Sequence, residues 1–140
     1  MPAQSCYTYL TFDGNCQEAF EFYRKVFGGE FQVFSTFGEG PEDSSLSDAD
    51  KDRIMHVSLS IGTTVLMGSD SNAGATVNQG DNFSLSVTMD RKDECDELLT
   101  RLATGSSITM EMQEQFWGSY FGMCVDKFGI NWMVLSEPDQ

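Results

Sequence analysis

The chain contains an internal repeat at an offset of 76 residues. The helical stretches 18–23 and 94–99 are separated by this offset, at which Gly29 also falls on Gly105. Strand-like runs lie on both sides of each helix. A fixed offset that covers a helix, its stop signal and its flanking strands predicts two copies of one supersecondary unit. Few folds are built from two such units in a chain of 140 residues.

Each copy is predicted to have the element order β-α-β-β-β. The first helix is expected to begin at Asn15, with Glu18 completing a capping box, and to end at a glycine pair. Residues 38–52 are rich in acidic side chains and poor in apolar ones, which predicts a mobile acidic loop. The predicted strands cover residues 5–12, 31–37, 53–61 and 63–69, then 83–88, 108–112, 119–125 and 130–135.

The predicted fold is therefore α+β, with two βαβββ modules that form a cupped mixed β-sheet. The modules are expected at residues 5–70 and 81–136, joined by a polar linker at 71–80. We expect residues 1–140 to form a single domain, because a chain of this length buries one core. A sheet with one helix on one face leaves its other face and an edge uncovered, and this predicts a homodimer.

Composition limits the partners of the chain. The net charge of −14 argues against binding to nucleic acid or to an anionic membrane, because phosphate would be repelled. The four cysteines contain no CxxC pair, which is typical of free thiols in a reducing cytosol. No signal peptide and no membrane-spanning run is visible, so we expect a cytoplasmic location.

Several short motifs resemble the PhnB-like group of the vicinal oxygen chelate superfamily, which includes glyoxalase I, bleomycin-resistance proteins and extradiol dioxygenases. The resemblance covers nearly the whole chain and implies a glyoxalase/bleomycin-resistance-like fold. Some PhnB-like chains carry a methyltransferase label, which we discount because no Gly-rich strand-to-helix loop is present to hold a nucleotide-type cofactor. The motifs are the helix start at 15–23, His56-Val57-Ser58-Leu59, residues 66–70, Phe116-Trp117-Gly118 and residues 126–133.

The resemblance also implies where a metal would bind. Metal-using members take His, Gln or Glu ligands from the first and last strand of each module. By pattern, the first-strand positions fall at Tyr7 or Thr8 and near Asn82, and the last-strand positions fall near Met67 and Met133. None of these side chains is a good ligand for a hard or borderline cation. We therefore predict no metal at the inherited site, and no cofactor.

A small-molecule pocket remains the favoured function, without the metal of the family. His56 is the only histidine, and we expect it in the pocket wall with Asp70 or Glu114 within reach. Aromatic side chains would supply the apolar lining, with amide and carboxylate groups as anchors. The predicted ligand is a small organic molecule. The predicted pocket residues are Tyr9, His56, Asp70, Asn82, Gln113, Glu114, Trp117 and Trp132.

Two alternatives stay open at this point. One is a divalent-metal-dependent lyase, isomerase or dioxygenase with relocated ligands, drawn from His56, Asp70, Glu111 and Glu114. The other is a structural dimer module, in which His56 and Asp70 are hydrogen-bonded structural residues and the aromatic side chains are core.

Overall fold

The computed structural model describes residues 1–42, 45–72 and 74–138, and within them the chain divides into two compact units. The first unit is Met1–Asn78 and the second is Gln79–Gln140. The division lies inside the segment 71–80 that was predicted as a linker. The predicted α+β class with two βαβββ modules is confirmed, while the single-domain organisation over residues 1–140 stays a prediction.

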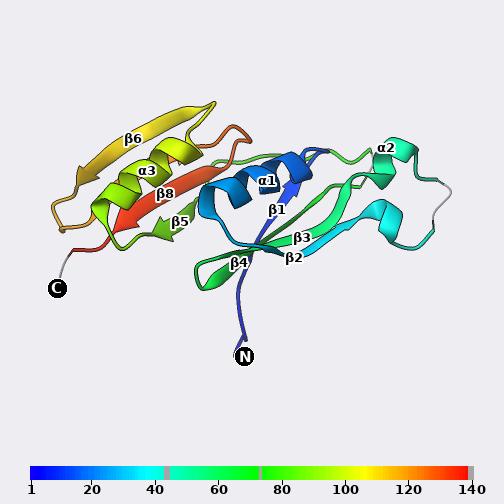
Figure 1. Ribbon diagram of the computed structural model, residues 1–140, viewed down its shortest axis with the longest axis horizontal. Helices are drawn as coiled ribbons and strands as arrows, with labels where there is room; N and C mark the ends of the chain where they lie inside the picture. The colour runs from blue at the N-terminus through cyan, green and yellow to red at the C-terminus, as the bar shows by residue number, and fades with distance from the viewer. Residues whose placement is uncertain (43–44, 73, 139–140) are drawn as a thin grey trace. The chain divides into compact units, whose positions relative to one another are not determined.

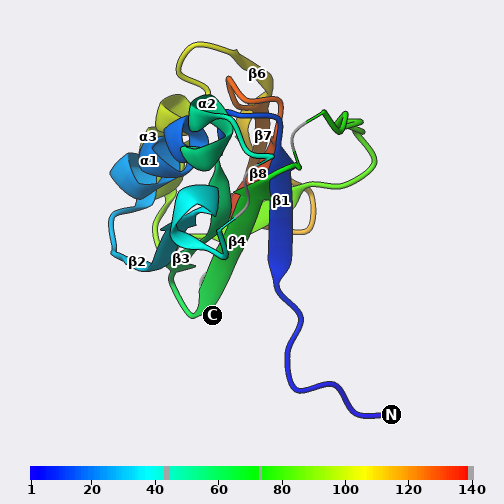
Figure 2. The ribbon, with the colours of Figure 1, turned by 90° about the vertical axis from the view of Figure 1, so that its right-hand side faces the viewer.

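The first unit is a four-stranded mixed sheet with one long helix (Figure 1). Its strand order is β1-β4-β3-β2, with β1 parallel to β4 and the other pairs antiparallel. Figure 2 shows the same unit turned, with β1 at one edge of the sheet. Its elements are β1 (Thr8–Phe12), α1 (Cys16–Phe27), β2 (Phe31–Thr36), η1 (Phe37–Glu39), α2 (Asp48–Lys51), β3 (Ile54–Ile61) and β4 (Thr64–Asp70).

The second unit repeats this arrangement. Its strand order is β5-β8-β7-β6, with β5 parallel to β8 and the other pairs antiparallel. The elements are β5 (Leu85–Thr88), α3 (Lys92–Leu102), β6 (Ser107–Glu114), β7 (Tyr120–Val125) and β8 (Asn131–Ser136). In both units the last strand therefore lies between the first and the third strand of its own module. None of the helices in the described residues is long and apolar enough to cross a membrane.

Helix α1 packs on the sheet through side chains spaced three and four residues apart. Cys16, Ala19, Phe20 and Tyr23 are all fully buried, as the amphipathic pattern predicts. The Phe20 ring approaches β4 so closely that a Cβ at Gly68 would lie 2.6 Å from its Cε2 atom. Glycine at this position therefore lets the helix lie directly on the sheet.

The predicted capping box at the start of α1 is wrong. The Asn15 side chain makes no capping hydrogen bond. Instead, the Cys16 N–H donates a 3.0 Å hydrogen bond to the carboxylate of Asp70 at the end of β4. A free N–H at a helix start can donate to any nearby anionic oxygen, and the fold supplies such an acceptor from a distant strand.

Helix α3 covers one face of the second sheet in the same way. It contributes Cys95, Leu98, Leu99 and Leu102, which are buried. The sheet contributes Cys124, Trp132 and Val134, which are also buried. Each unit thus has its core between one helix and one face of its sheet.

The two modules differ in the connection that follows their second strand. The offset of 76 residues holds from Phe31 of β2 to Ser107 of β6, but it falls to 66 between Ile54 of β3 and Tyr120 of β7. The first module contains a longer connection, residues 37–53, that holds η1 and α2. Part of the predicted acidic loop is therefore helical, with Ser47 accepting a hydrogen bond from the Asp50 N–H at the start of α2. The loop also includes residues 43–44, which lie outside the described residues.

Candidate functional site

The candidate site lies on the face of the first sheet that points away from α1. Tyr9 pairs with Met67, and Met67 pairs with Ser58, so these three residues share that face. Their strand neighbours Leu66 and Gly68 are buried on the helix side. Because side chains alternate along a strand, His56 lies on the same face as Ser58. We call the face that carries Tyr9, His56, Ser58 and Met67 the open face.

Tyr9 and His56 form a stacked pair on the open face. Their ring centroids are 5.7 Å apart with 21° between the planes, and 3.4 Å separates the Tyr9 hydroxyl from His56 Nδ1. Tyr9 is 49% exposed and His56 is half-buried. Either group is able to donate the hydrogen bond, depending on the imidazole tautomer. The pair therefore offers a flat, partly apolar surface with a phenol and an imidazole at its polar edge.

The register of the strands shows which first-strand residue lies opposite each predicted last-strand position. Tyr9, and not Tyr7 or Thr8, lies opposite Met67. Ser86 of β5 lies opposite Met133, and Asn82 precedes that strand. A one-residue shift in register changes which side chains face the same way, and the sequence did not determine it.

The metal implied by the superfamily does not fit these residues. The strand positions concerned carry a phenol at Tyr9, a hydroxyl at Ser86 and thioethers at Met67 and Met133. A thioether or neutral hydroxyl binds a hard divalent cation poorly compared with imidazole or carboxylate. Within residues 1–42, 45–72 and 74–138, no group of three His, Cys, Asp or Glu side chains is placed to hold a metal ion.

Asp70 has a structural role and does not face His56. Its carboxylate is buried on the helix side of the sheet, where Oδ1 accepts hydrogen bonds from the N–H groups of Gly14 at 2.8 Å and Cys16 at 3.0 Å. Oδ2 accepts a 2.8 Å hydrogen bond from the Ile54 N–H. Asp70 thus ties the β1–α1 turn to the start of β3, and the placement of Asp70 beside His56 is a prediction that the geometry corrects.

Trp132 is likewise a core residue of its unit. It is 1% exposed on the side of the sheet that packs against α3. Its indole N–H donates a 2.8 Å hydrogen bond to Asp126, which sequence reasoning did not select as a key residue. The only hint was its place at the start of the Asp126-Lys127-Phe128-Gly129 turn, where aspartate commonly accepts backbone hydrogen bonds.

The other predicted residues of the second unit lie on its periphery. Asn82 is exposed before β5, and Gln113 is exposed near the end of β6. Glu114 forms an ion pair with Lys92 of α3, which lowers the pKa of its carboxyl through that hydrogen bond. Trp117 is 55% exposed in the β6–β7 connection and contacts the Phe116 ring edge-on. Their membership of a pocket stays a prediction.

Three of the cysteines are unsuited to act as nucleophiles. Cys16, Cys95 and Cys124 are buried, and burial raises the pKa of each thiol, to about 11 for Cys95 and Cys124. A neutral buried thiol attacks poorly because the thiolate is the reactive form. Cys6, in contrast, is exposed near the start of the chain.

Comparison with known proteins places the chain in a family. The family model described as 3-demethylubiquinone-9 3-methyltransferase matches residues 4–135. The chain belongs to this PhnB-like family. It is 30% identical over 143 residues to protein YjdN of Escherichia coli K12, covering 94% of this chain and 97% of YjdN.

Solved structures of family relatives share the fold. The protein PA1353 of Pseudomonas aeruginosa has a TM-score of 0.86 and 38% identity, over 98% of this chain and 100% of PA1353. The Bacillus cereus PhnB protein, titled a putative 3-demethylubiquinone-9 3-methyltransferase, has a TM-score of 0.77 and 26% identity, over 95% and 99% of the two chains.

A more distant structure shows the superfamily fold. A glyoxalase/bleomycin resistance protein/dioxygenase family enzyme of Burkholderia phytofirmans has a TM-score of 0.65 at 17% identity, over 93% of this chain and 95% of that one. The predicted glyoxalase/bleomycin-resistance-like fold class is therefore confirmed, and the family match confirms the predicted resemblance to the PhnB-like group.

The strand-to-helix turns of the described modules do not contain the Gly-rich loop that a methyltransferase with a nucleotide-type cofactor would be expected to have. The turn between β1 and α1 is residues 13–15, and the turn between β5 and α3 is residues 89–91. Only Gly14 among these six residues is a glycine. A Gly-rich loop of the kind that holds a nucleotide-type cofactor needs several glycines to let the backbone approach the ligand.

Proposed function

We propose that this protein binds a small organic molecule on the open face of the first sheet, without the metal of its superfamily. The observation that carries the proposal is the stacked Tyr9–His56 pair, in which Tyr9 lies on the first strand of its module, where metal-using relatives would be expected to place a ligand. The pair combines exposed ring surface with a phenol and an imidazole. Aromatic surface with a few polar groups is typical of small-molecule sites.

The surroundings of the pair favour a partly apolar ligand. Met67 pairs with Tyr9 across the strands and presents a flexible, polarisable thioether beside the rings. Ser58 is buried next to it and adds a hydroxyl. A planar or aliphatic ligand body would pack on Tyr9 and Met67, while a polar substituent would exchange a hydrogen bond with His56.

The first test measures binding directly by NMR. Protein labelled with ¹³C at the methionine methyl groups is titrated with a library of small aromatic alcohols and acids, and the Met67 signal is assigned with the Met67→Leu variant. We expect a subset of compounds to shift the Met67 signal and to lose about tenfold in affinity in Tyr9→Ala, since a stacked aromatic contact and its buried area are removed. Tyr120→Phe, in the other unit, is the matched control and should keep the affinity.

Two results would contradict the proposal. Compounds that bind without moving the Met67 signal, or whose affinity is unaffected by Tyr9→Ala, would place the ligand elsewhere.

The second test is elemental analysis of protein purified without chelator or affinity tag, and we expect no stoichiometric transition metal. One equivalent of a divalent metal per chain, with an activity lost on chelation, would instead support the metal-dependent lyase, isomerase or dioxygenase.

We also propose that the protein is a homodimer in the cytoplasm. Exposed Tyr9 and Val33 lie on strands of the sheet on which α1 packs from one side, and a sheet face without such a cover favours association. Light scattering at micromolar concentration should give twice the mass of 15.6 kDa. A monomer mass at every concentration would show that this part of the proposal is wrong.

A further inference from the structure

The longer connection of the first module, residues 37–53, forms a hollow. The hollow lies between η1, α2 and the start of β3 and has a volume of about 710 Å³. A second hollow of about 360 Å³ continues from it and shares four of its residues. Ligand sites commonly measure about 300–1,000 Å³. The larger hollow is lined by Phe37, Pro41, Glu42, Ser45, Leu46, Asp50, Arg53, Met55 and Asn72.

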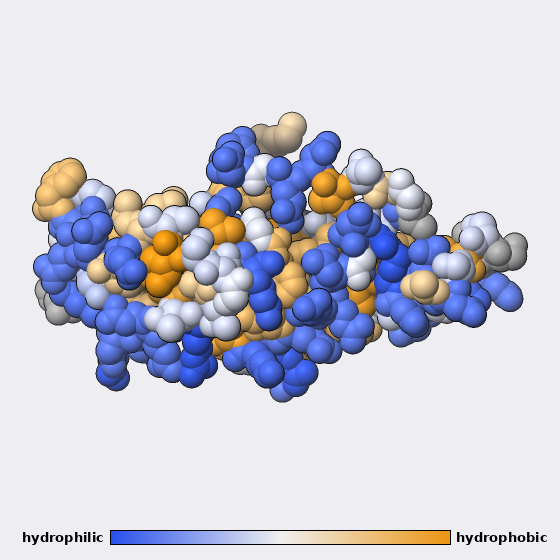
Figure 3. All heavy atoms as spheres, turned by 90° about the horizontal axis from the view of Figure 1, so that it is seen from above, coloured by the Kyte–Doolittle hydropathy of each residue, from blue (hydrophilic) through white to orange (hydrophobic). Residues whose placement is uncertain are grey.

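The wall of the hollow is apolar on one part and acidic on another. Phe37, Pro41, Leu46 and Met55 supply a ring, aliphatic groups and a thioether. In the space-filling view, apolar atoms lie among hydrophilic ones on the right of the picture, the side on which Figure 1 shows α2 (Figure 3). An aromatic ring beside a thioether is a favourable surface for the apolar part of a ligand and for a positive charge.

The positive groups of the wall already have partners. Arg53 donates to the Asp13 carboxylate at 3.2 Å and to the Ser71 carbonyl at 2.9 Å, and its side chain is only 17% exposed. Lys51, in the smaller hollow, lies 3.9 Å from Asp48. The hollow therefore offers little positive charge to an anionic ligand.

The negative groups of the wall differ from the positive ones in this respect. Among the residues that the structure describes, neither Glu42 nor Asp50 forms an ion pair. Asp50 is half-buried on α2 and lines the hollow beside its apolar wall. A carboxylate in such a place attracts a cation more strongly than one in bulk solvent does. The net charge of −14 adds a long-range attraction for cations.

We propose that this hollow binds a small organic cation, an amine or quaternary ammonium with an apolar body. The cationic head lies between Asp50 and Glu42 with the Phe37 ring within reach, and the apolar body packs on Leu46 and Met55. The site is separate from the Tyr9–His56 pair and does not depend on the function proposed for that pair.

The experiment compares three probes that differ in charge. Benzyltrimethylammonium, benzyl alcohol and phenylacetate are titrated against full-length protein labelled with ¹³C at the methionine methyl groups, and the Met55 signal is assigned with Met55→Leu. We expect the cation to shift the Met55 signal and to bind more tightly than the neutral probe, and the anion to bind most weakly. Equal binding of the cation and benzyl alcohol would overturn the proposal, as would a cation that leaves the Met55 signal unmoved.

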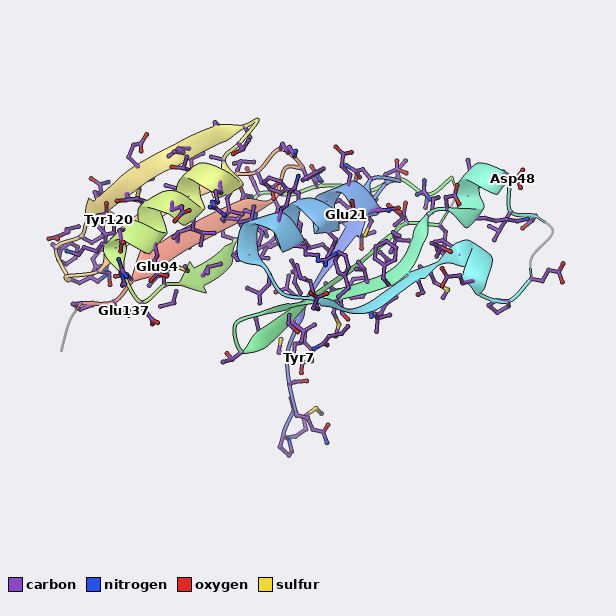
Figure 4. All side chains as sticks on the ribbon, viewed as in Figure 1. Tyr7, Glu21, Asp48, Glu94, Tyr120 and Glu137 are labelled. Atoms are coloured by element: carbon purple, nitrogen blue, oxygen red, sulfur yellow. The ribbon has the colours of Figure 1, made fainter. Side chains whose placement is uncertain are left out.

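A matched pair of variants separates a site from general attraction to an acidic surface. Asp50→Asn should weaken benzyltrimethylammonium binding about fivefold, since it removes the partly buried partner charge. Asp48→Asn removes a charge of the same sign from the same helix and is the control. Asp48 is fully exposed and is not among the residues that line the hollow (Figure 4). It should change the affinity less than about twofold. Equal losses in both variants would show non-specific attraction and overturn the proposal.

A third variant tests the apolar wall. Phe37→Leu keeps the wall apolar and removes the aromatic ring. It should therefore lower the affinity for benzyltrimethylammonium about threefold and leave the affinity for benzyl alcohol nearly unchanged. Circular dichroism and the thermal midpoint of each variant establish that the fold is kept. If Phe37→Leu leaves the cation affinity unchanged while the protein stays folded, the proposed placement of the cationic head is wrong.

Discussion

The indole N–H of Trp132 donates a 2.8 Å hydrogen bond to Oδ2 of Asp126, and both side chains are buried. The other carboxylate oxygen, Oδ1, accepts the backbone N–H of Phe128 at 2.8 Å and of Ile130 at 3.1 Å. One carboxylate therefore holds the turn between β7 and β8 and fixes the largest core side chain of the second unit. Buried carboxylates survive in a core when they are hydrogen-bonded in this way.

We expect Asp126→Asn to lower the free energy of unfolding by about 2–3 kcal/mol. Asparagine is neutral and has one acceptor oxygen in place of two. Its NH₂ group would therefore lie against an N–H donor, and the hydrogen bond of that donor would be lost. Urea denaturation followed by tryptophan fluorescence measures the change. Asp90→Asn is the control, because Asp90 is exposed, and it should stay within about 0.5 kcal/mol of the parent. A similar small effect for Asp126→Asn would contradict this role.

Asp70→Asn should destabilise the first unit by about 2–3 kcal/mol, because three backbone N–H groups from Gly14, Cys16 and Ile54 lose a charged acceptor. Binding of any ligand on the open face should persist below the unfolding transition, since Asp70 lies on the other side of the sheet. Chemical denaturation gives the first quantity, and the Met67 methyl titration gives the second. Loss of ligand binding in an Asp70→Asn variant that is still folded would show that Asp70 contributes to the ligand site.

Gly68→Ala should lower the free energy of unfolding by about 1–3 kcal/mol. The added Cβ would lie 2.6 Å from Phe20 Cε2 and 2.9 Å from the Leu10 carbonyl oxygen, so either the helix or the sheet must move. Gly80→Ala is the control, since its Cβ would lie 3.5 Å from its nearest neighbour, the Asn82 side chain. Thermal denaturation of the two variants should separate them clearly. Equal midpoints would show that α1 has room to shift.

A thiol reagent should modify one cysteine per native chain at neutral pH and all four in denaturant. Cys16, Cys95 and Cys124 are buried, and burial raises the pKa of each thiol, so they stay protonated and covered. Quantitative labelling followed by mass spectrometry should place the native modification on Cys6. Fast labelling of a second cysteine in native protein would reveal an opening of the core.

The same thiols should make the fold less stable in alkali. In the unfolded chain a thiol loses its proton near pH 9, whereas burial raises the pKa of Cys124 in the fold to about 11. Between these two values the unfolded chain binds fewer protons than the folded chain, so stability falls as pH rises. Urea midpoints at pH 7 and pH 10 should differ less in Cys124→Ala than in the parent. An equal difference would exclude this contribution.

The sequence predicted the elements well because their signals are local. The apolar spacing of Cys16, Ala19, Phe20 and Tyr23 defines the buried side of α1 without reference to the rest of the chain. The glycine pair after Phe27 marks the end of that helix, and the cap at Gly28 has the positive φ of 76° that glycine adopts readily. The 76-residue repeat extended these local signals to a second module.

Site residues were predicted less well because they depend on register and on long-range pairing. Tyr9 was selected as an aromatic lining residue, but only the β1–β4 register shows that it, rather than Tyr7, lies opposite Met67. Asp70 resembles a ligand in sequence because nothing local reveals that its partners are 16 to 56 residues away. The hollow beside α2 was missed because an acidic, glycine-containing stretch resembles a solvated loop.

The position of the last strand in each module has a consequence for synthesis of the chain. Among the residues that the structure describes, strand β1 forms its ladder with β4 alone, and Thr8 pairs with Leu66, which is translated 58 residues later. During translation β2 and β3 become available first as a hairpin, while β1 has no partner until β4 leaves the ribosome. We expect nascent chains that stop short of β4 to expose an unpaired edge and to recruit chaperones, and longer ones to close the first module before β5 is made.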